Sequence, residues 1–197
     1  MLDTEKLNYY FGIFKNLELK DLTAIFKLVK IKKLKAGEIF IKEGEYYKKI
    51  SYIKKGLIRA FLIQENGDEI TTLIRWEDQF ISSHDSILFD QPSRFAYQAI
   101  ENSTILEVDY DIAQNFMTKN PKLELGRIHF LKKMLGESIL RVETFILLNP
   151  EERYLKLTKE KPDIINRVPS KYIATLLGIT PVSLSRIRNR IANQRKH

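Results

Sequence analysis

Cysteine does not occur among the 197 residues of this chain. Without a thiol, the chain has no disulfide, no thiolate zinc site, no cysteine-ligated iron–sulfur cluster and no catalytic cysteine. Long apolar runs are missing as well. No segment reaches the roughly 18 apolar residues of a membrane helix, and the first residues, MLDTEKLNYYFG, carry acids where a signal peptide would be apolar. We therefore expect a cytoplasmic protein with no membrane partner.

Acidic residues are absent after Asp163. The chain has a formal net charge of +8, and residues 149–197 contain eleven Lys and Arg against four Asp and Glu, a net of +7. The other 22 basic and 21 acidic residues leave only +1 for residues 1–148. Such a basic segment attracts a polyanion and releases its counterions, so we expect salt-dependent binding to nucleic acid. A basic terminus that merely improves solubility is the alternative.

The basic segment contains the pattern of two short consecutive helices. In SKYIATLLGITPVSLSRIRNRI, Ser170 is suited to cap a helix that begins near Lys171. Gly178 follows where a left-handed residue lets the backbone reverse, and Thr180 and Pro181 are the cap and first residue of a second helix. Two short helices joined by a turn of about three or four residues are typical of a helix-turn-helix, whose second helix enters a DNA major groove.

The side chains of these two helices divide into an inward and an outward set. Ala174, a small residue, stands where the helices would cross, and the apolar residues suited to bury the crossing are Ile173, Leu177, Ile179, Leu184 and Ile187. The outward face is polar and basic, which favours DNA binding over an ordinary helical hairpin. The predicted DNA-binding residues are Ser170, Lys171, Thr180, Val182, Ser183, Ser185, Arg186, Asn189 and Arg190.

Seven short segments rich in β-branched and aromatic residues lie between residues 31 and 109. They cover residues 31–41, 48–55, 57–64, 69–76, 79–82, 95–100 and 103–109. Asn66-Gly67 between two of them predicts a hairpin with a type I′ turn, in which both central residues need positive φ. Many strands at short intervals predict a sandwich or a jelly-roll barrel.

Helical patterns flank this β region on both sides. Residues 4–29 carry an apolar stripe typical of one or two short helices. Asn120 and Pro121 predict the start of a helix that continues to about Leu148, with apolar residues three and four apart as in a coiled coil. This spacing predicts a dimer interface formed by Ile128, Leu131, Leu135, Ser138, Val142 and Phe145. Packing of the helix on its own sandwich is the alternative.

The patterns divide the chain into three parts. Residues 1–119 are the predicted sensor domain, residues 120–148 the dimerisation helix, and residues 149–197 the helix-turn-helix domain, which begins at the helix cap Asn149-Pro150. The expected fold class is therefore α+β, with an N-terminal jelly-roll, a long central dimerisation helix and a C-terminal helix-turn-helix domain.

The order of these parts resembles the Crp/Fnr family of bacterial transcription regulators. The resemblance covers nearly the whole chain and is carried by KAGEIFIKEGEYYKKISYIKKGLIRAF, the Asn66-Gly67 hairpin, Asn120-Pro121 and RVPSKYIATLLGITPVSLSRIR. It implies a cyclic-nucleotide-binding-like double-stranded β-helix that senses a small molecule, and a homodimer that binds a two-fold symmetric operator on double-stranded DNA. RNA polymerase is a further candidate partner, and no cofactor is expected.

The sensor part departs from the cyclic-nucleotide binders of that family. Those proteins hold the phosphate with a Gly-Glu pair and a later Arg-Ser pair, whereas the corresponding segments here are residues 80–86 and Ser93-Arg94-Phe95. The Gly-Glu pair is missing, and the arginine is shifted by about one residue. The resemblance therefore implies an effector pocket with Ser82, Ser83 and Arg94, and leaves the effector unidentified.

Other functions compete with this interpretation. An enzyme is disfavoured because the chain has no phosphate loop, no nucleophile elbow and no set of metal ligands that would converge on His84-Asp85. A cyclic-nucleotide or other small-ligand binding module with little DNA binding would share the same sensor domain. A constitutive regulator would result if the pocket were filled by Phe80, Phe89, Phe95 and Tyr97.

Overall fold

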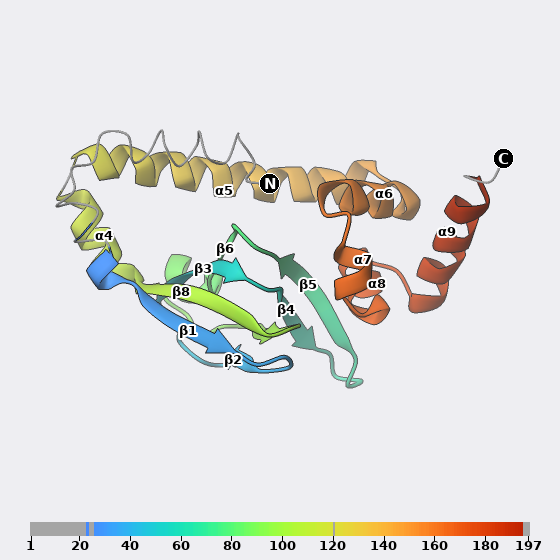
Figure 1. Ribbon diagram of the computed structural model, residues 1–197, viewed down its shortest axis with the longest axis horizontal. Coiled ribbons are helices and arrows are strands. Elements are labelled where there is room, and N and C mark those ends of the chain that lie inside the picture. The colour runs from blue at the N-terminus through green and yellow to red at the C-terminus, as the bar shows by residue number, and fades with distance from the viewer. Residues whose placement is uncertain (1–22, 24–25, 120, 195–197) are drawn as a thin grey trace.

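A sandwich of two four-stranded antiparallel sheets occupies residues 30–109 (Figure 1). The computed structural model describes residues 23, 26–119 and 121–194. One sheet has the strand order β1 (Lys30–Leu34), β8 (Ser103–Asp109), β3 (Lys49–Lys55) and β6 (Phe80–Ile81). The other has the order β2 (Ile39–Ile41), β7 (Ala96–Ala99), β4 (Ile58–Ile63) and β5 (Glu69–Arg75). The strands confirm the predicted segments, and segment 31–41 divides at Gly37 into β1 and β2.

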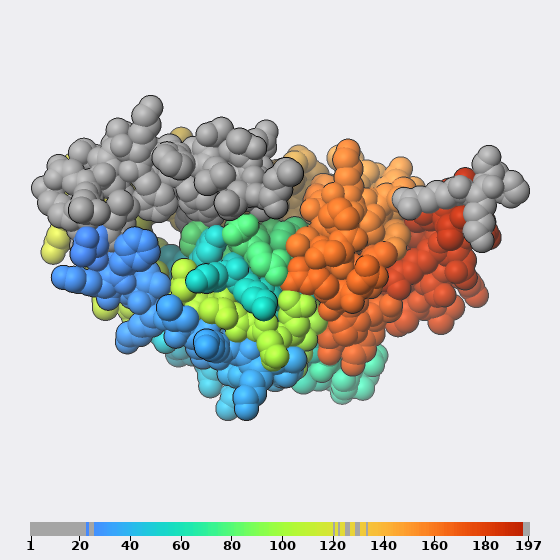
Figure 2. Space-filling model, in the orientation of Figure 1, coloured from blue at the N-terminus to red at the C-terminus, as the bar shows by residue number. Residues whose placement is uncertain are grey.

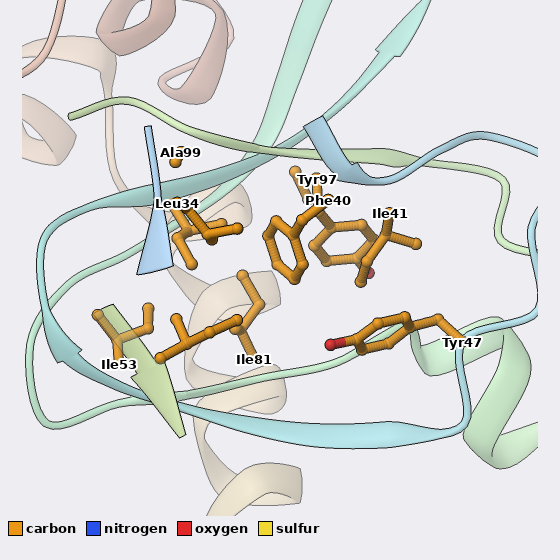
Figure 3. Packing of buried hydrophobic residues seen from close by; sticks show 11 residues of the cluster. Leu34, Phe40, Ile41, Tyr47, Ile53, Ile81, Tyr97 and Ala99 are labelled. Carbon is orange, nitrogen blue, oxygen red and sulfur yellow. The ribbon is translucent and has the colours of Figure 1, made fainter. Parts of the chain in front are cut away.

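The core of the sandwich comes from side chains of both sheets that point toward one another (Figure 3). Along β8 every second residue is buried, as the two-residue period of a strand requires. The Phe40 ring packs edge-on against Tyr47 and Tyr97, with ring centroids 5.9 Å and 6.3 Å apart. One charge is buried with them: Glu107 is 5% exposed, accepts a hydrogen bond from the Tyr47 hydroxyl and lies 3.5 Å from the ammonium of Lys49. These partners satisfy the buried carboxylate.

The hairpin between β4 and β5 lies at the predicted place, but its turn differs from the prediction. A type I′ turn needs a positive φ at both central residues. Gly67 has φ +84°, but φ of Asn66 is not positive, so the turn is not type I′. The Gly67 N–H donates to the Gln64 carbonyl over 2.8 Å, and the Gln64 N–H donates to the Asp68 carbonyl over 2.9 Å. This is a three-residue loop with one left-handed glycine, the next commonest hairpin class. The Asn66 side chain accepts from the Asp68 N–H over 3.0 Å, which stabilises that alternative.

Helices account for the remaining elements. They are α3 (His84–Leu88), α4 (Tyr110–Thr118), α5 (Pro121–Leu147), α6 (Pro150–Glu160), α7 (Ile164–Arg167), α8 (Ser170–Leu176) and α9 (Pro181–Gln194). The 27-residue α5 follows the predicted course and runs along the sandwich (Figure 1). Helix α4 was not predicted; it is capped by Asp109, whose carboxylate accepts from the Ile112 N–H over 3.1 Å. The predicted cap Asn120 and almost all of the helical segment 4–29 lie outside the described residues.

The C-terminal helices pack directly against the sandwich. One buried cluster joins Leu57 and Ile74 of the sandwich to residues of α6, α7, α8 and α9. Helix α8 lies beside the edge strand β5, where the Thr71 N–H donates to the Thr175 hydroxyl over 3.1 Å. In Figure 2, orange residues of the C-terminal part abut green residues of the sandwich. Helices α6 to α9 therefore share part of their core with the sandwich.

A buried cation lies at this contact. Arg59 in β4 is 1% exposed, and its guanidinium carbon lies 3.9 Å from the ring centroid of Phe61 and 3.6 Å from that of Tyr172 in α8. Its Nε donates to the Gln98 amide oxygen over 2.8 Å, and its terminal nitrogen donates to the Glu69 carboxylate over 2.6 Å. Ring stacking and charge-assisted hydrogen bonds compensate the lost hydration of the guanidinium. The arrangement attaches α8 to the sandwich.

A second cation, Arg167 at the end of α7, joins the same two parts. It donates to Glu77 after β5 over 3.1 Å, to Glu101 before β8 over 2.6 Å, and to Asp163 over 3.0 Å. Its hydrogen bonds with Glu101 and Glu77 raise its pKa. Carboxylates from two loops of the sandwich therefore converge on one residue of the C-terminal helices.

Candidate nucleic-acid interface

The turn between α8 and α9 has the predicted backbone path. Gly178 has φ +69°, in the left-handed region that glycine adopts without steric cost. The Ile179 N–H donates back to the Ala174 carbonyl over 3.0 Å and so closes the end of α8. Thr180 caps α9, because its hydroxyl accepts from the Ser183 N–H over 3.1 Å. Local hydrogen bonds thus fix the turn between the two helices.

The predicted apolar crossing of the two helices is confirmed. Ala174 has no exposed surface, and its small side chain lets α8 and α9 approach. Buried around it are Ile173, Leu177, Leu184 and Ile187, while Ile179 is partly buried against them. Burial of these residues at the crossing leaves the opposite side of α9 facing outward.

The outward face of α9 carries most of the residues predicted to bind DNA. The exposed ones are Val182, Ser185, Arg186, Asn189 and Arg190, and Ser183 is partly buried. Within the described part of the chain, Arg186 makes no ion pair or hydrogen bond. Arg190 is committed to an ion pair with Glu151 of α6. Arg186 is therefore the free cation at the centre of this face.

Ser170 has a different local role from the one predicted. Helix α8 begins at Ser170 itself with Pro169 as its cap, and no side-chain capping hydrogen bond forms. The Ser170 hydroxyl instead accepts from Arg188 of α9 over 2.7 Å. Lys171 beside it is exposed, with its ammonium 5.0 Å from the centroid of the Tyr172 ring. Ser170, Lys171 and Thr180 lie at the exposed N-terminal ends of α8 and α9, where backbone N–H groups can meet a phosphate.

The residues predicted for the dimer interface lie on an exposed apolar face of α5. Exposed fractions in this set are 40% for Ile128 and Leu131, 62% for Leu135, 59% for Val142 and 42% for Phe145. Ile139 and Ile146, which the heptad spacing omitted, belong to the same face and are 50% and 75% exposed. Ser138 is exposed as well, with its hydroxyl bonded to the carbonyl of Met134. A row of large apolar side chains in contact with water is typical of a surface that a partner covers.

The residues carried over for an effector pocket are engaged with other parts of the chain. The Ser82 hydroxyl donates to the Lys49 carbonyl over 2.7 Å, and the buried Ser83 caps α3. Arg94 donates through its Nε to the Asp85 carboxylate over 2.9 Å, and its N–H donates to the same carboxylate over 2.9 Å. Burial alone would raise the pKa of Asp85, but these bonds from Arg94 lower it overall. Arg94, which the resemblance assigned to an effector pocket, is therefore already paired with the Asp85 carboxylate.

The aromatic residues expected to fill a pocket separate into two groups. Phe89 is 61% exposed, and Phe80 packs against Tyr52 with ring centroids 5.3 Å apart. Phe95 and Tyr97 line a cavity between the sandwich and α5. These four side chains therefore do not fill a common pocket.

Two further observations concern metals and membranes. Within residues 26–119 and 121–194, no three His, Asp or Glu residues come together as a metal site would require. No helix in the same part of the chain combines the length and the apolar character needed to cross a membrane.

Sequence comparison connects the chain to bacterial regulators. The cyclic nucleotide-binding domain family matches residues 31–120. The fumarate and nitrate reduction regulatory protein of Vibrio cholerae is 30% identical over 141 residues, which cover 70% of this chain and 54% of that protein. The chain spans about half the length of this relative and of the regulatory protein HlyX of Actinobacillus pleuropneumoniae.

Solved structures show that the fold extends beyond the sandwich. FixK2 from Bradyrhizobium japonicum superposes with a TM-score of 0.71 at 12% identity, over 84% of this chain and 85% of that one. A protein from Eubacterium rectale described as a regulator of the Crp/Fnr family superposes with a TM-score of 0.69 at 15% identity, over 95% of this chain and 88% of that one. The likeness in fold therefore covers most of the chain.

Proposed function

Because this chain belongs to the Crp/Fnr family, we propose that it is a sequence-specific DNA-binding transcription regulator that acts as a homodimer. In this proposal, residues 1–119 are a sensor domain, residues 120–148 a dimerisation helix and residues 149–197 a helix-turn-helix domain. Such a protein would act on promoters in the cytoplasm, with RNA polymerase as a candidate partner. The relatives named above are regulatory proteins, and the proposal includes no enzymatic step.

One observation carries the DNA-binding part of the proposal. Helix α9 buries Leu184 and Ile187 against α8 and leaves Arg186 and Asn189 exposed. In a helix-turn-helix, the outward side chains of the second helix contact base edges while the ends of both helices contact the backbone. Arg186 fits a bidentate contact to guanine or a contact to phosphate, and Asn189 fits a contact to adenine.

The exposed apolar face of α5 supports the dimer part of the proposal. Ile128, Leu135, Ile139, Val142 and Ile146 recur three, four and seven residues apart, so a second copy of α5 would bury them in a coiled-coil seam. Two-fold symmetry then presents two copies of α9. The operator would contain two half-sites about ten base pairs, or about 34 Å, apart.

The first experiment identifies an operator and then changes the central cation. Fragments of genomic DNA that bind the purified protein are selected and sequenced, and one of them is used in a gel-shift titration. We expect Arg186→Ala to weaken binding by about 1–3 kcal/mol, or roughly 5- to 150-fold, because a base or phosphate contact is lost. Lys54→Ala, which removes one positive charge from an exposed position on β3, is the matched control and should bind as the parent does.

Two results would contradict the proposal. If Arg186→Ala and Lys54→Ala bind the operator equally well, α9 does not read DNA. If no genomic fragment is enriched over unrelated DNA, the chain is a small-ligand binding module with little DNA binding.

A further inference from the structure

Arg188 of α9 lies at a place in the helix where an apolar residue is expected. Leu184, one turn before it, is 1% exposed, and Ile191, one turn after it, is partly buried against the C-terminal core. Residues three and four apart share one face of a helix, so Arg188 does not belong to the outward face of Arg186 and Asn189. It is partly buried accordingly. The predicted DNA-binding residues do not include it.

The guanidinium of Arg188 is poorly compensated for its burial. Its Nε and Nη2 atoms are buried, and neither has a hydrogen-bond partner among the described residues. Arg188 makes no ion pair in that part of the chain, and its guanidinium carbon lies 5.7 Å from the centroid of the Tyr154 ring. Buried donors without acceptors destabilise a fold, and an apolar side chain of similar size at such a place is often as stable or more stable. Stability therefore does not explain an arginine at position 188.

The third nitrogen of this guanidinium makes a specific contact. Nη1 of Arg188 donates to the Ser170 hydroxyl over 2.7 Å. Among the described residues, this is the only side-chain hydrogen bond between α8 and α9. Ser170 is the first residue of α8 and lies at the end of that helix away from the turn at Gly178. The bond therefore joins the two helices at the end where the backbone does not.

This bond complements two other contacts between α8 and α9. The hydrogen bond from the Ile179 N–H to the Ala174 carbonyl fixes the turn, and buried side chains such as Ile187 fill the crossing. Apolar packing has little directional preference, so the crossing alone constrains the tilt of α9 weakly. A hydrogen bond has a preferred length and angle. The bond between Arg188 and Ser170 therefore fixes the tilt that the turn and the crossing leave open.

We propose that Arg188 is a positioning residue for DNA binding, which acts through Ser170 to hold α9 at one tilt relative to α8. Its meaning for DNA rests on the proposed function. A helix-turn-helix contacts base edges with its second helix and the backbone with the ends of its helices. Arg186 on α9 and the exposed Lys171 on α8 can meet one duplex together only if the tilt between their helices is held.

The absence of cysteine allows this tilt to be measured without DNA. Lys171→Cys and Asn193→Cys place one nitroxide label on each helix at exposed positions. Doubly labelled chains are diluted with unlabelled ones, so that pulsed electron paramagnetic resonance records distances within one chain. We expect a narrow distance distribution in this labelled parent and a broader or displaced one when Arg188→Met is added. Arg188→Lys keeps a charged donor and should restore most of the narrow distribution.

Gel-shift titrations with the selected operator measure the consequence for DNA. Arg188→Met should weaken operator binding about tenfold, because the face of α9 is no longer held in register with α8. The urea midpoint of the same variant should stay equal or rise, because the two unpaired donors are removed. A merely stabilising arginine would give the opposite result for the midpoint.

A double variant tests whether Arg188 acts through Ser170. Ser170→Ala removes the acceptor and should weaken operator binding as well. Ser170→Ala combined with Arg188→Met should bind no more weakly than the weaker single variant, because both changes remove the same bond. Lys159→Met is the matched control, because it removes an exposed cation from α6 of the same domain, and it should bind as the parent does.

Any one of three results would overturn the proposal. They are an unchanged distance distribution in Arg188→Met, equal operator binding by Arg188→Met and Lys159→Met, and independent, additive losses in the double variant. The label measurement contains no DNA, so it decides whether Arg188 holds the tilt even if no operator is found. A parent that binds no operator would contradict the proposed function and leave the measured distances unaffected.

Discussion

Glu77 is the carboxylate through which the sandwich holds α7. It accepts from Arg167 over 3.1 Å and from the Gly56 N–H over 3.0 Å, and the Lys161 ammonium lies 3.4 Å away. Burial alone would raise the pKa of Glu77, but Arg167 and the backbone donors lower it overall from 4.5 to about 2. Because the folded protein holds the carboxylate ionised, its contribution to stability is complete above pH 4.5 and is lost as the pH falls toward about 2.

The expected result follows from that sign. The free energy of unfolding should fall as the pH is lowered from 4.5 toward 2, and Glu77→Gln should show a weaker fall over the same window. Urea unfolding at several pH values measures this dependence of the free energy of unfolding on pH. Glu65→Gln, at an exposed position of the β4–β5 loop, is the control and should follow the parent. Identical pH profiles for Glu77→Gln and the parent would show that the contacts of Glu77 do not stabilise the packing of α7 on the sandwich.

At the residue scale, sequence patterns predicted conformations better than partners. The left-handed Gly178 and the cap at Thr180 follow from the chemistry of one or two neighbouring residues, and the structure confirms both. Ser170 has the same capping chemistry, yet Arg188 from another helix takes its hydroxyl. Arg59 lies in an ordinary strand pattern, and nothing near it in the sequence indicates that Tyr172 stacks on it. Long-range contacts of this kind leave no local signal.

Among the elements, the edge strand β5 depends on α8. The Thr71 N–H is buried and has the Thr175 hydroxyl as its acceptor over 3.1 Å. Thr175→Val keeps the shape of the side chain but leaves this donor unsatisfied, so we expect a loss of about 1–3 kcal/mol in the free energy of unfolding. Thr175→Ser keeps the hydroxyl and should lose less. If the valine variant is as stable as the serine variant in urea, the hydrogen bond does not hold α8 on the sheet.

Helix α5 carries the exposed apolar face on which the proposed dimer rests. Leu135 and Ile139 are 62% and 50% exposed, and in the proposed seam both would be buried. Leu135→Glu combined with Ile139→Glu places like charges in that seam, so we expect dissociation to a monomer by light scattering. Lys54→Glu, at an exposed position on β3, should leave the mass unchanged. A parent protein that is already monomeric at micromolar concentration would contradict the dimer.

The elements themselves were predicted with different success. The structure confirms the strands predicted from alternation and the helix α5 predicted from its apolar period. Both patterns depend on nearest neighbours along the chain. The type I′ turn was wrong because the Asn66 side chain favours a three-residue loop with one left-handed residue. The short α4 was missed because its pattern follows β8 without a break other than the Asp109 cap.

For the whole molecule, the sequence predicted the order of the parts but not how they adjoin. The helix cap predicted at Asn149-Pro150 is present, and the Glu152 carboxylate accepts from the Asn149 N–H over 2.8 Å. The contacts of Arg59 and Arg167 restrict motion about that point in the structure described here. Any reorientation of α9 on ligand binding would have to break them or carry the sandwich strands along.

Hydroxyl-radical footprinting of a selected genomic fragment tests the central claim most directly. It reports both whether α9 contacts the DNA and whether a dimer presents two copies of α9. The account predicts two protected blocks on one face of the duplex, about ten base pairs apart, that disappear together in Arg186→Ala. A single protected block, or two blocks that persist in Arg186→Ala, would contradict it.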